Sequence, residues 1–291
     1  MTKLRKAVLP VAGLGTRVLP ATKVMPKEML PVFDRPALQY VIDEAVAAGI
    51  EHFIFVTGRN KQSIEDYFDQ AYELEATLEK KGKTDALGQL QALLPEAGAC
   101  SFVRQQAPLG LGHAIWCARD LVGDEPFAVL LPDMIMVSET PCLAQMSTAH
   151  AKFGGNILAV EEVPRSEVSK YGIVDVEDQK DGLMAMKGMV EKPSIEDAPS
   201  NFMISGRYIL EPDIFELLSN QAAGTGGEIQ LTDSMARLMQ SRPFKALPFD
   251  GRTYDTGSKL GYLEAFLALS ARDSEWGDQA KSLIKSFAET I

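Results

Sequence analysis

The segment Ala7-Val-Leu-Pro-Val-Ala-Gly-Leu-Gly-Thr-Arg17 decides the fold, because an entirely apolar run passes directly into a glycine turn. We predict that Ala7–Ala12 is a buried strand, and a strand that ends in a glycine turn is the usual opening of an α/β unit. Gly13 and Gly15 carry no side chain, so the backbone amides of the turn can approach a phosphate group closely.

The glycine turn matches neither of two common nucleotide-binding fingerprints. The dinucleotide fingerprint G-x-G-x-x-G needs glycine where Val18 stands, and it needs an acidic residue ending a second strand about 20 residues further on. The phosphate loop of ATPases needs Gly-Lys-Ser/Thr, which does not follow here. These mismatches disfavour a Rossmann dehydrogenase and a P-loop ATPase. The nearby cations Arg17, Lys23 and Lys27 favour phosphate binding over a plain strand-to-helix connection.

Beyond the turn, apolar strands and amphipathic helices alternate. Such alternation predicts a largely parallel, doubly wound sheet whose loops at the strand carboxyl ends form the site. From Asn156 onward strands follow one another with little helix between them, which indicates a mixed or antiparallel layer. A polar surface excursion is expected at 80–99. We expect strands at 52–57, 101–104, 127–131, 157–163, 172–176, 186–190 and 203–209, and helices at 38–46, 64–78, 113–121, 213–219, 232–240, 259–271 and 279–289.

The composition narrows the class of protein. With 291 residues, 46% of them hydrophobic and 24% charged, the chain has the balance of a globular protein with a sizeable core. Its net charge of −11 argues against a nucleic-acid polymer or an anionic membrane as the main partner. The widely spaced cysteines fit a reducing cytoplasm, and we find neither a bilayer-spanning run nor a convincing signal peptide. We therefore expect a soluble, cytoplasmic protein.

A pair of aspartates is the strongest candidate for a metal site. Asp133 follows the apolar strand that ends in Leu130-Leu-Pro, so it projects from the carboxyl edge of the sheet, where a cation bridging phosphates would sit. By itself it is equally well explained as a helix N-cap or turn residue. Asp255, within Tyr254-Asp-Thr-Gly257, is a candidate partner. Because Mg²⁺ needs only one or two protein carboxylates, these two suffice.

Other motifs offer groups for a base and a sugar. The carboxamide of Gln105 can read a pyrimidine edge, and Gly110 would let the base lie close to the backbone, although a surface turn is the alternative. The pair Glu191-Lys192 closes an apolar strand; glutamate can accept from sugar hydroxyls and lysine can bind a sugar phosphate, and a solvated strand end is the alternative. Gly172 permits close approach. Glu228 is a further hydroxyl acceptor or a capping residue.

Taken together and in order, the motifs resemble the bacterial UTP–glucose-1-phosphate uridylyltransferases, also called UDP-glucose pyrophosphorylases, over nearly the whole chain. The related thymidylyltransferases typically carry two adjacent glycines and a Ser-Lys-Gln-Leu-Leu-Pro segment where this chain has Ala12-Gly13 and Pro26-Lys-Glu-Met-Leu-Pro31. Thr256 departs from the family pattern, which has cysteine or another small residue there, and it touches no assigned role. The resemblance is carried by Pro10–Arg17, Leu19–Lys23, Met25–Pro31, Gly110–Ala114, Leu131–Asp133, Lys170–Gly172, Glu191–Pro193, Gly226–Asp233 and Tyr254–Gly261.

The resemblance implies an α/β fold of the nucleotide-diphospho-sugar transferase type, a Rossmann-like α/β/α sandwich around a mixed, mostly parallel sheet. It implies a single nucleotidyltransferase domain over 1–291. Within it, 1–135 would be the nucleotide-binding half and 136–260 the sugar-phosphate-binding half. The helices in 261–291 would be free to form a homodimer or homotetramer.

The resemblance also implies a role for each matching residue. The nucleotide would be bound by Ala12, Gly13, Gly15, Glu28, Gln105 and Gly110. Arg17 and Lys27 would grip the triphosphate, Lys192 the sugar phosphate, and these three with Asp133 would be the catalytic residues. The Mg²⁺ ligands would be Asp133 and Asp255. The sugar would contact Gly172, Glu191, Lys192 and Glu228.

The implied reaction joins UTP and glucose 1-phosphate to give UDP-glucose and pyrophosphate, by Mg²⁺-assisted in-line attack on the α-phosphorus. A thymidylyltransferase that uses dTTP remains an alternative, because one methyl group is worth only ~1–3 kcal/mol in a pocket. A second alternative is a non-catalytic sugar-nucleotide-binding homologue. It is disfavoured because all of Arg17, Lys27, Asp133, Lys192 and Asp255 are intact.

Overall fold

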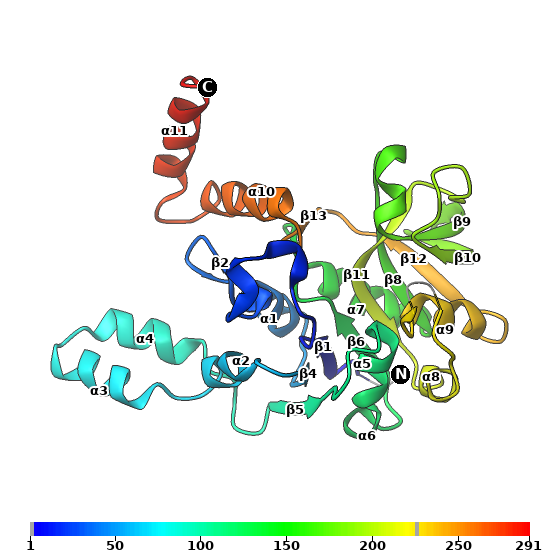
Figure 1. Cartoon of the computed structure of the whole chain (residues 1–291), viewed down its shortest axis with the longest axis horizontal. Helices are drawn as coiled ribbons and strands as arrows, with labels where there is room; N and C mark the ends of the chain where they lie inside the picture. Colours follow the sequence, from blue (N-terminus) through cyan, green and yellow to red (C-terminus); the bar gives the residue numbers. More distant parts are fainter. Residues whose placement is uncertain (1–2, 225–226) are drawn as a thin grey trace.

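The fold is built on one central β-sheet, as seen in the computed structural model, which describes residues 3–224 and 227–291 (Figure 1). Within these residues the sheet has nine strands in the order β5-β4-β1-β6-β11-β8-β12-β10-β9. The strands are β1 (Lys6–Pro10), β4 (His52–Thr57), β5 (Cys100–Arg104), β6 (Phe127–Leu130), β8 (Asn156–Glu162), β9 (Gly172–Lys180), β10 (Leu183–Glu191), β11 (Phe202–Leu210) and β12 (Phe244–Pro248).

The two halves of the chain contribute different kinds of strand pairing. β5, β4, β1 and β6 pair with one another in parallel, as the alternating pattern predicted. β11 is antiparallel to both β6 and β8, β12 is parallel to β8, and β10 is antiparallel to β12 and β9. The mixed second layer is therefore confirmed, and parallel pairing dominates only the first half. The parallel strands place their carboxyl ends at one edge, where a binding site is expected.

Helices cover both faces of the sheet, which makes an α/β/α sandwich (Figure 1). On one face α1 and α7 bury Val41, Leu143 and Met146 against the strands. On the other face α5, α8 and α9 bury residues such as Ile115 and Met235. The helices are α1 (Ala37–Ala47), α5 (Leu111–Cys117), α6 (Arg119–Val122), α7 (Cys142–Phe153), α8 (Ile214–Ser219) and α9 (Leu231–Leu238).

Several elements differ from the sequence-based expectation. The single helix expected over 64–78 is two helices, α2 (Gln62–Tyr67) and α3 (Tyr72–Lys80), and α3 pairs with α4 (Thr84–Ala92) in an arm that extends from the body (Figure 1). Neither α3 nor α4 has a buried residue, whereas Ile64 of α2 is fully buried, so only the first part of the expected helix faces the core. We did not anticipate the helix α7. We also did not anticipate three short strands, β12, β7 (Met134–Val137) and β13 (Arg252–Asp255), because such short strands carry little periodic signal.

Arg207 on β11 joins several elements at the centre of the fold. Its side chain is completely buried and forms an ion pair with Glu44 of α1, with 2.8 Å between Nη2 and Oε2. The guanidinium also donates to the carbonyl oxygens of Leu131 and Met134, at 3.1 and 2.9 Å. Glu44 in turn accepts from the backbone N–H of Leu143 in α7, at 3.0 Å. This buried pair fixes α1, α7 and the loop after β6 to the middle of the sheet.

The C-terminal helices α10 (Lys259–Ser270) and α11 (Gly277–Ala288) follow β13, and α10 packs against β13 and the β2–β3 hairpin (Pro31–Val32, Arg35–Pro36; Figure 1). Phe266 of α10 meets Phe33 of the hairpin edge to face, with 6.1 Å between ring centroids. Among residues 3–224 and 227–291, every helix is too short or too polar to cross a membrane.

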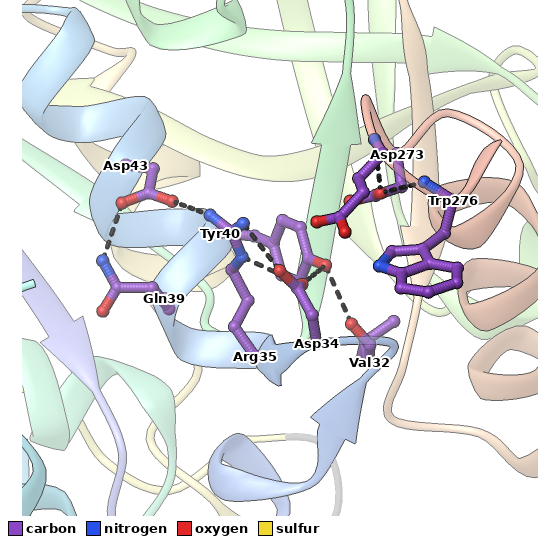
Figure 2. A network of polar contacts seen from close by, with 9 residues as sticks. Val32, Asp34, Arg35, Gln39, Tyr40, Asp43, Asp273 and Trp276 are labelled. Atoms are coloured by element: carbon purple, nitrogen blue, oxygen red, sulfur yellow. Dashed lines mark hydrogen bonds and ion pairs between the residues drawn. The ribbon is translucent and has the colours of Figure 1, made fainter. Parts of the chain in front are cut away.

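Polar contacts surround the place where α10 passes into α11 (Figure 2). The hydroxyl of Tyr40 contacts the carbonyl oxygen of Val32 at 2.8 Å and the carboxylate of Asp34 at 3.0 Å. Asp273 lies opposite this group in Figure 2, and its carboxylate accepts from the backbone N–H of Trp276 at 2.7 Å. Asp273 also accepts from the backbone N–H of Glu275 at 2.9 Å, so its carboxylate holds the backbone of the turn that precedes α11.

Candidate active site

A cavity of about 1070 Å³ opens at the carboxyl ends of the parallel strands. Both halves of the chain line it, which agrees with a site for two substrates. Its size suits a ligand at least as large as a nucleotide, because ligand pockets typically span roughly 300–1,000 Å³. Of the residues that the sequence predicted, it brings together Ala12, Gly13, Gly15, Arg17, Lys27, Gln105, Gly110, Asp133, Gly172, Glu191, Lys192, Glu228 and Asp255.

The glycine turn has the backbone conformation expected of a phosphate-binding loop. Gly15 adopts φ 66°, in the left-handed region that favours glycine, and its carbonyl oxygen accepts from the Thr22 hydroxyl at 2.7 Å. A Cβ at Gly15 would lie 3.1 Å from Cγ2 of Thr22. The chain then makes three 3₁₀ turns, Thr16–Val18, Ala21–Lys23 and Lys27–Met29, before α1 begins. The side chain of Arg17 at the first turn is exposed in the cavity wall.

Lys27 contacts Asp133 across the floor of the cavity, with 2.5 Å between Nζ and Oδ2. Burial opposes the charged form of both groups. The opposite charges outweigh burial, however, so the pKa of Lys27 is raised and the pKa of Asp133 is lowered. Both groups are therefore charged at neutral pH, and each stabilises the other's charge in the absence of phosphate.

The position of Asp255 fits a shared cation site with Asp133. A Cβ at Gly257 would lie 2.7 Å from Oδ2 of Asp133 and 2.9 Å from Oδ1 of Asp255, so both carboxylates face the space that a side chain would fill. Burial and the negative charge of Asp133 raise the pKa of Asp255, as expected for carboxylates that crowd one another. The part of the chain that the structure describes has no cluster of three potential ligands. A divalent cation held here would complete its shell with phosphate and water oxygens.

Thr256 has a role that the sequence did not reveal. Both its backbone N–H and its hydroxyl donate to the carbonyl oxygen of Asp133, at 2.8 and 2.9 Å. On either side of it, Asp255 supplies a carboxylate and Gly257 donates its N–H to that carboxylate at 2.8 Å. The segment Asp255–Gly257 therefore supplies one aspartate and holds the backbone of the other. The assumption that Thr256 touches no functional residue is wrong.

Gln105 and Gly110 lie together in the cavity wall. The carboxamide nitrogen of Gln105 contacts the carbonyl oxygen of Gly110 at 3.0 Å and Nδ1 of His113 at 3.1 Å, so the carboxamide oxygen is the atom it can offer to a base. Gly110 has φ 107°, and a Cβ there would lie 2.8 Å from both Glu228 Cβ and Ile229 O. Contact with the 228–229 segment therefore requires glycine at this position.

A second part of the cavity wall, which contains Gly172, Glu191 and Thr232, is formed where β9 and β10 meet α9. Glu191 accepts from the Thr232 hydroxyl at 2.7 Å and lies 3.3 Å from the ammonium group of Lys192. A Cβ at Gly172 would be 3.2 Å from Oε2 of Glu191, so only glycine leaves this carboxylate accessible. Lys192 adopts φ 46°, a backbone conformation that is uncommon for residues other than glycine. Such conformations cluster at functional sites, so this one is consistent with a functional role for Lys192. Thr232 is a contact that the sequence analysis did not assign.

Glu228 reaches the same cavity from the loop before α9. Its carboxylate accepts from the carboxamide of Gln230 at 3.1 Å. In the matching motif, Gly226 lies outside the described residues.

Glu28 is the predicted site residue that the structure does not place in the cavity. Its side chain is fully buried and is paired with the buried Lys61, with 2.8 Å between Oε2 and Nζ. A direct contact between Glu28 and the nucleoside is therefore not supported by this arrangement. Lys61 was missed because its only sequence signal is a cation in the loop after β4.

Comparison with known proteins agrees with this site. The model of the nucleotidyl transferase family matches residues 6–272. A curated relative from Bacillus subtilis (strain 168), UTP–glucose-1-phosphate uridylyltransferase, is 49% identical and covers 96% of this chain and 95% of its own length. A second, UTP–glucose-1-phosphate uridylyltransferase 1 of Staphylococcus saprophyticus, is 47% identical and covers 98% of this chain and 99% of its own.

Solved structures agree in both fold and sequence. UDP-glucose pyrophosphorylase from Acinetobacter baumannii has a TM-score of 0.90 and 46% identity, over 98% of this chain and 99% of that one. A UTP-bound form from the same organism has a TM-score of 0.89 and 47% identity, over 97% and 98%. The chain therefore belongs to the nucleotidyl transferase family, within its branch of UTP–glucose-1-phosphate uridylyltransferases. The resemblance and the fold inferred from the sequence motifs are thereby confirmed.

The role of Thr256 leads to a prediction. In Thr256→Val, Asp133 loses one donor to its carbonyl oxygen, and a hydrogen bond of this kind is worth roughly 0.5–1.5 kcal/mol. We expect binding of Mn²⁺, titrated by electron paramagnetic resonance, to weaken by about two- to tenfold. Thr256→Ser should retain parental affinity.

A matched control is available on β13, the strand that precedes Thr256. The hydroxyl of Thr253 is buried without a hydrogen-bond partner, so Thr253→Val should leave Mn²⁺ affinity unchanged. Equal affinities in Thr256→Val and the parent protein would show that the hydroxyl does not position the aspartate.

Proposed function

We propose that the protein transfers the uridylyl group of UTP to glucose 1-phosphate, which yields UDP-glucose and pyrophosphate. The observation that carries the proposal is the joint cavity. Arg17, Lys27 and Asp133 come from one half of the chain, and Glu191 and Lys192 from the other. The same substrates are supported by the relatives, which are named UTP–glucose-1-phosphate uridylyltransferases. One of the related structures contains UTP and another contains UDP-glucose.

The reaction needs little acid–base chemistry from the protein. An anionic phosphate oxygen of glucose 1-phosphate attacks the α-phosphorus in line, and the bond from that phosphorus to the bridging oxygen breaks. Pyrophosphate leaves with the electron pair. Because the nucleophile is already an anion, the main barrier is the repulsion between two anionic substrates. Arg17 and Lys27 would neutralise the triphosphate and Lys192 the sugar phosphate, so positioning and electrostatics supply most of the catalysis.

Asp133 and Asp255 are the residues that would hold Mg²⁺. Their oxygens are the ligands that this ion prefers, and the small space over Gly257 faces both. Bound there, the ion would neutralise phosphate charge. Lys27 contacts Asp133, so we expect its ammonium group to shift toward the triphosphate when substrate and metal bind.

The remaining residues would orient the substrates. The backbone of Ala12 and Gly13, with the carboxamide oxygen of Gln105, would bind the nucleoside, while Gly15 allows the turn. Gly110 would pack beneath the nucleoside. Glu191 and Glu228 would accept from glucose hydroxyls, over the open surface left by Gly172.

The direct test is pyrophosphate release from a matrix of nucleoside triphosphates and sugar 1-phosphates, with and without Mg²⁺. We expect UTP with glucose 1-phosphate and Mg²⁺ to give the highest rate, and removal of the metal to abolish turnover. A higher rate with dTTP would support the thymidylyltransferase alternative. No release from any pair would support a non-catalytic homologue.

Lys192 provides a sharper test of the sugar-phosphate site. In Lys192→Ala we expect kcat/KM for glucose 1-phosphate to fall by about 10- to 100-fold, since a hydrogen bond to a charged group contributes roughly 1.5–3 kcal/mol. UTP binding, measured by calorimetry, should be nearly unchanged. Lys187→Ala is the control, because Lys187 lies on β10, the strand that Lys192 follows, and its ammonium group pairs with Glu177. Equal losses for both substrates would contradict the assignment.

We also propose that the enzyme is a homodimer or homotetramer that assembles through its C-terminal helices. α11 presents Leu283 and Phe287 on one face, with 71% and 64% of their surfaces exposed, and α10 is the element that it contacts most. An apolar face of this kind is typical of an interface.

Substitution of the apolar face tests this assembly. We expect Leu283→Ser/Phe287→Ser to lower the mass measured by light scattering to that of a smaller assembly or monomer. The polar-face control Lys281→Ser/Lys285→Ser should keep the parental mass. A parent protein that is already monomeric would contradict the proposal.

The setting of the reaction follows from the same chemistry. The three cysteines are free, which suits the reducing cytoplasm that we propose as its location. The acidic net charge of −11 is consistent with small phosphorylated partners rather than a nucleic-acid polymer.

A further inference from the structure

The ion pair between Glu28 and Lys61 lies behind the cavity rather than in it. Glu28 is completely buried and Lys61 is 5% exposed, and their charged atoms are 2.8 Å apart. The second carboxylate oxygen of Glu28, Oε1, is buried and has no hydrogen-bond partner. Lys61 is therefore the residue that directly satisfies this carboxylate. Isolated buried charges are strongly disfavoured, so the pair is costly to keep and still more costly to break.

Glu28 is the direct neighbour of Lys27, the cation at the cavity floor. Both belong to the short 3₁₀ turn Lys27–Met29, in which neighbouring side chains point in different directions. Lys27 reaches into the cavity and contacts Asp133, whereas Glu28 points into the protein and contacts Lys61. The Lys61 contact thus anchors the turn from which Lys27 extends.

The charges of these four side chains alternate in sign from the cavity to the interior: Asp133, Lys27, Glu28 and Lys61. After Lys61, Lys27 is the cation that acts most strongly on Glu28, and burial raises the pKa of Glu28 despite both. If Lys61 lost its charge, Lys27 would be the nearest replacement counter-ion for the buried carboxylate. An ammonium group drawn toward Glu28 would no longer be directed at a triphosphate.

We propose that Lys61 is a positioning residue for the nucleotidyl transfer: by compensating Glu28, it leaves the charge of Lys27 available to the triphosphate and the departing pyrophosphate. The role goes beyond holding the fold, because it is specific to one substrate. It rests on the proposed function only in that Lys27 binds the triphosphate. Glucose 1-phosphate, whose phosphate is assigned to Lys192, should be little affected.

The experiment compares Lys61→Met, Glu28→Gln and the double variant Glu28→Gln/Lys61→Met. UTP and pyrophosphate binding are measured by calorimetry, and KM for glucose 1-phosphate is measured separately. We expect Lys61→Met to weaken UTP and pyrophosphate binding by about tenfold or more, the loss expected when a charged contact is removed. The double variant should return to within about threefold of the parent, because no buried carboxylate remains to attract Lys27.

A second comparison separates positioning from folding. In a Lys27→Ala background, Lys61→Met should cause no further loss of UTP affinity, since residues that act through one another are not additive. Lys61→Arg, which keeps the charge, should retain much of the UTP affinity that Lys61→Met loses. Lys6→Met is the matched control, because Lys6 pairs with Glu125 at the opposite end of β1. It should leave UTP binding unchanged.

The outcomes are distinct from those that test the proposed function. Equal losses in Lys61→Met and the double variant, or a further loss in the Lys27→Ala background, would overturn the positioning role. So would a loss for glucose 1-phosphate as large as that for UTP. If the parent bound UTP but released no pyrophosphate with any sugar 1-phosphate, the proposed function would fail, while the binding comparison would still decide the role of Lys61.

Discussion

The buried guanidinium of Arg207 is the interaction on which the rest of the structure depends. It carries a full charge into the centre of the sheet, and Glu44 together with the carbonyl oxygens of Leu131 and Met134 satisfies it there. Those carbonyl groups flank Asp133. A single charged group therefore sets the position of three elements. Two of them, α1 and the loop that carries the predicted metal ligand Asp133, come from the first half of the chain, and β11 comes from the second half.

The site follows the same logic of compensated charge. The cavity must attract polyphosphates although the chain is strongly acidic, and two of its cations are paired with carboxylates, Lys27 with Asp133 and Lys192 with Glu191. Behind the cavity, the buried Lys61 is paired with Glu28 in the same way. Arg17 has no such partner among the described residues, which leaves its guanidinium free for substrate. Phosphate groups can replace these contacts because they offer the same negative charge.

Glycines join the two halves at the cavity. Gly110 and Gly112 pack against the segment around Ile229, where the N–H of Gly112 donates to the Ile229 carbonyl at 2.8 Å. The N–H of Ile229 donates in return to the Leu109 carbonyl at 2.7 Å. These two hydrogen bonds hold Glu228, the residue before Ile229, against the loop that contains Gly110. A side chain at either glycine would separate the walls that have to bind two substrates at once.

The sequence by itself determined the first buried strand, the glycine turn, the parallel first half and a set of site residues of which all but Glu28 line the cavity, because strand burial and turn chemistry are local properties. Only the tertiary structure decided what depends on residues far apart in the chain. It paired Glu28 with Lys61 and removed that carboxylate from the cavity, it gave Gly110 a packing partner, and it assigned Thr256 to the backbone of Asp133. Neither periodicity nor spacing encodes such contacts, since each depends on how the strands of the two halves are ordered in one sheet.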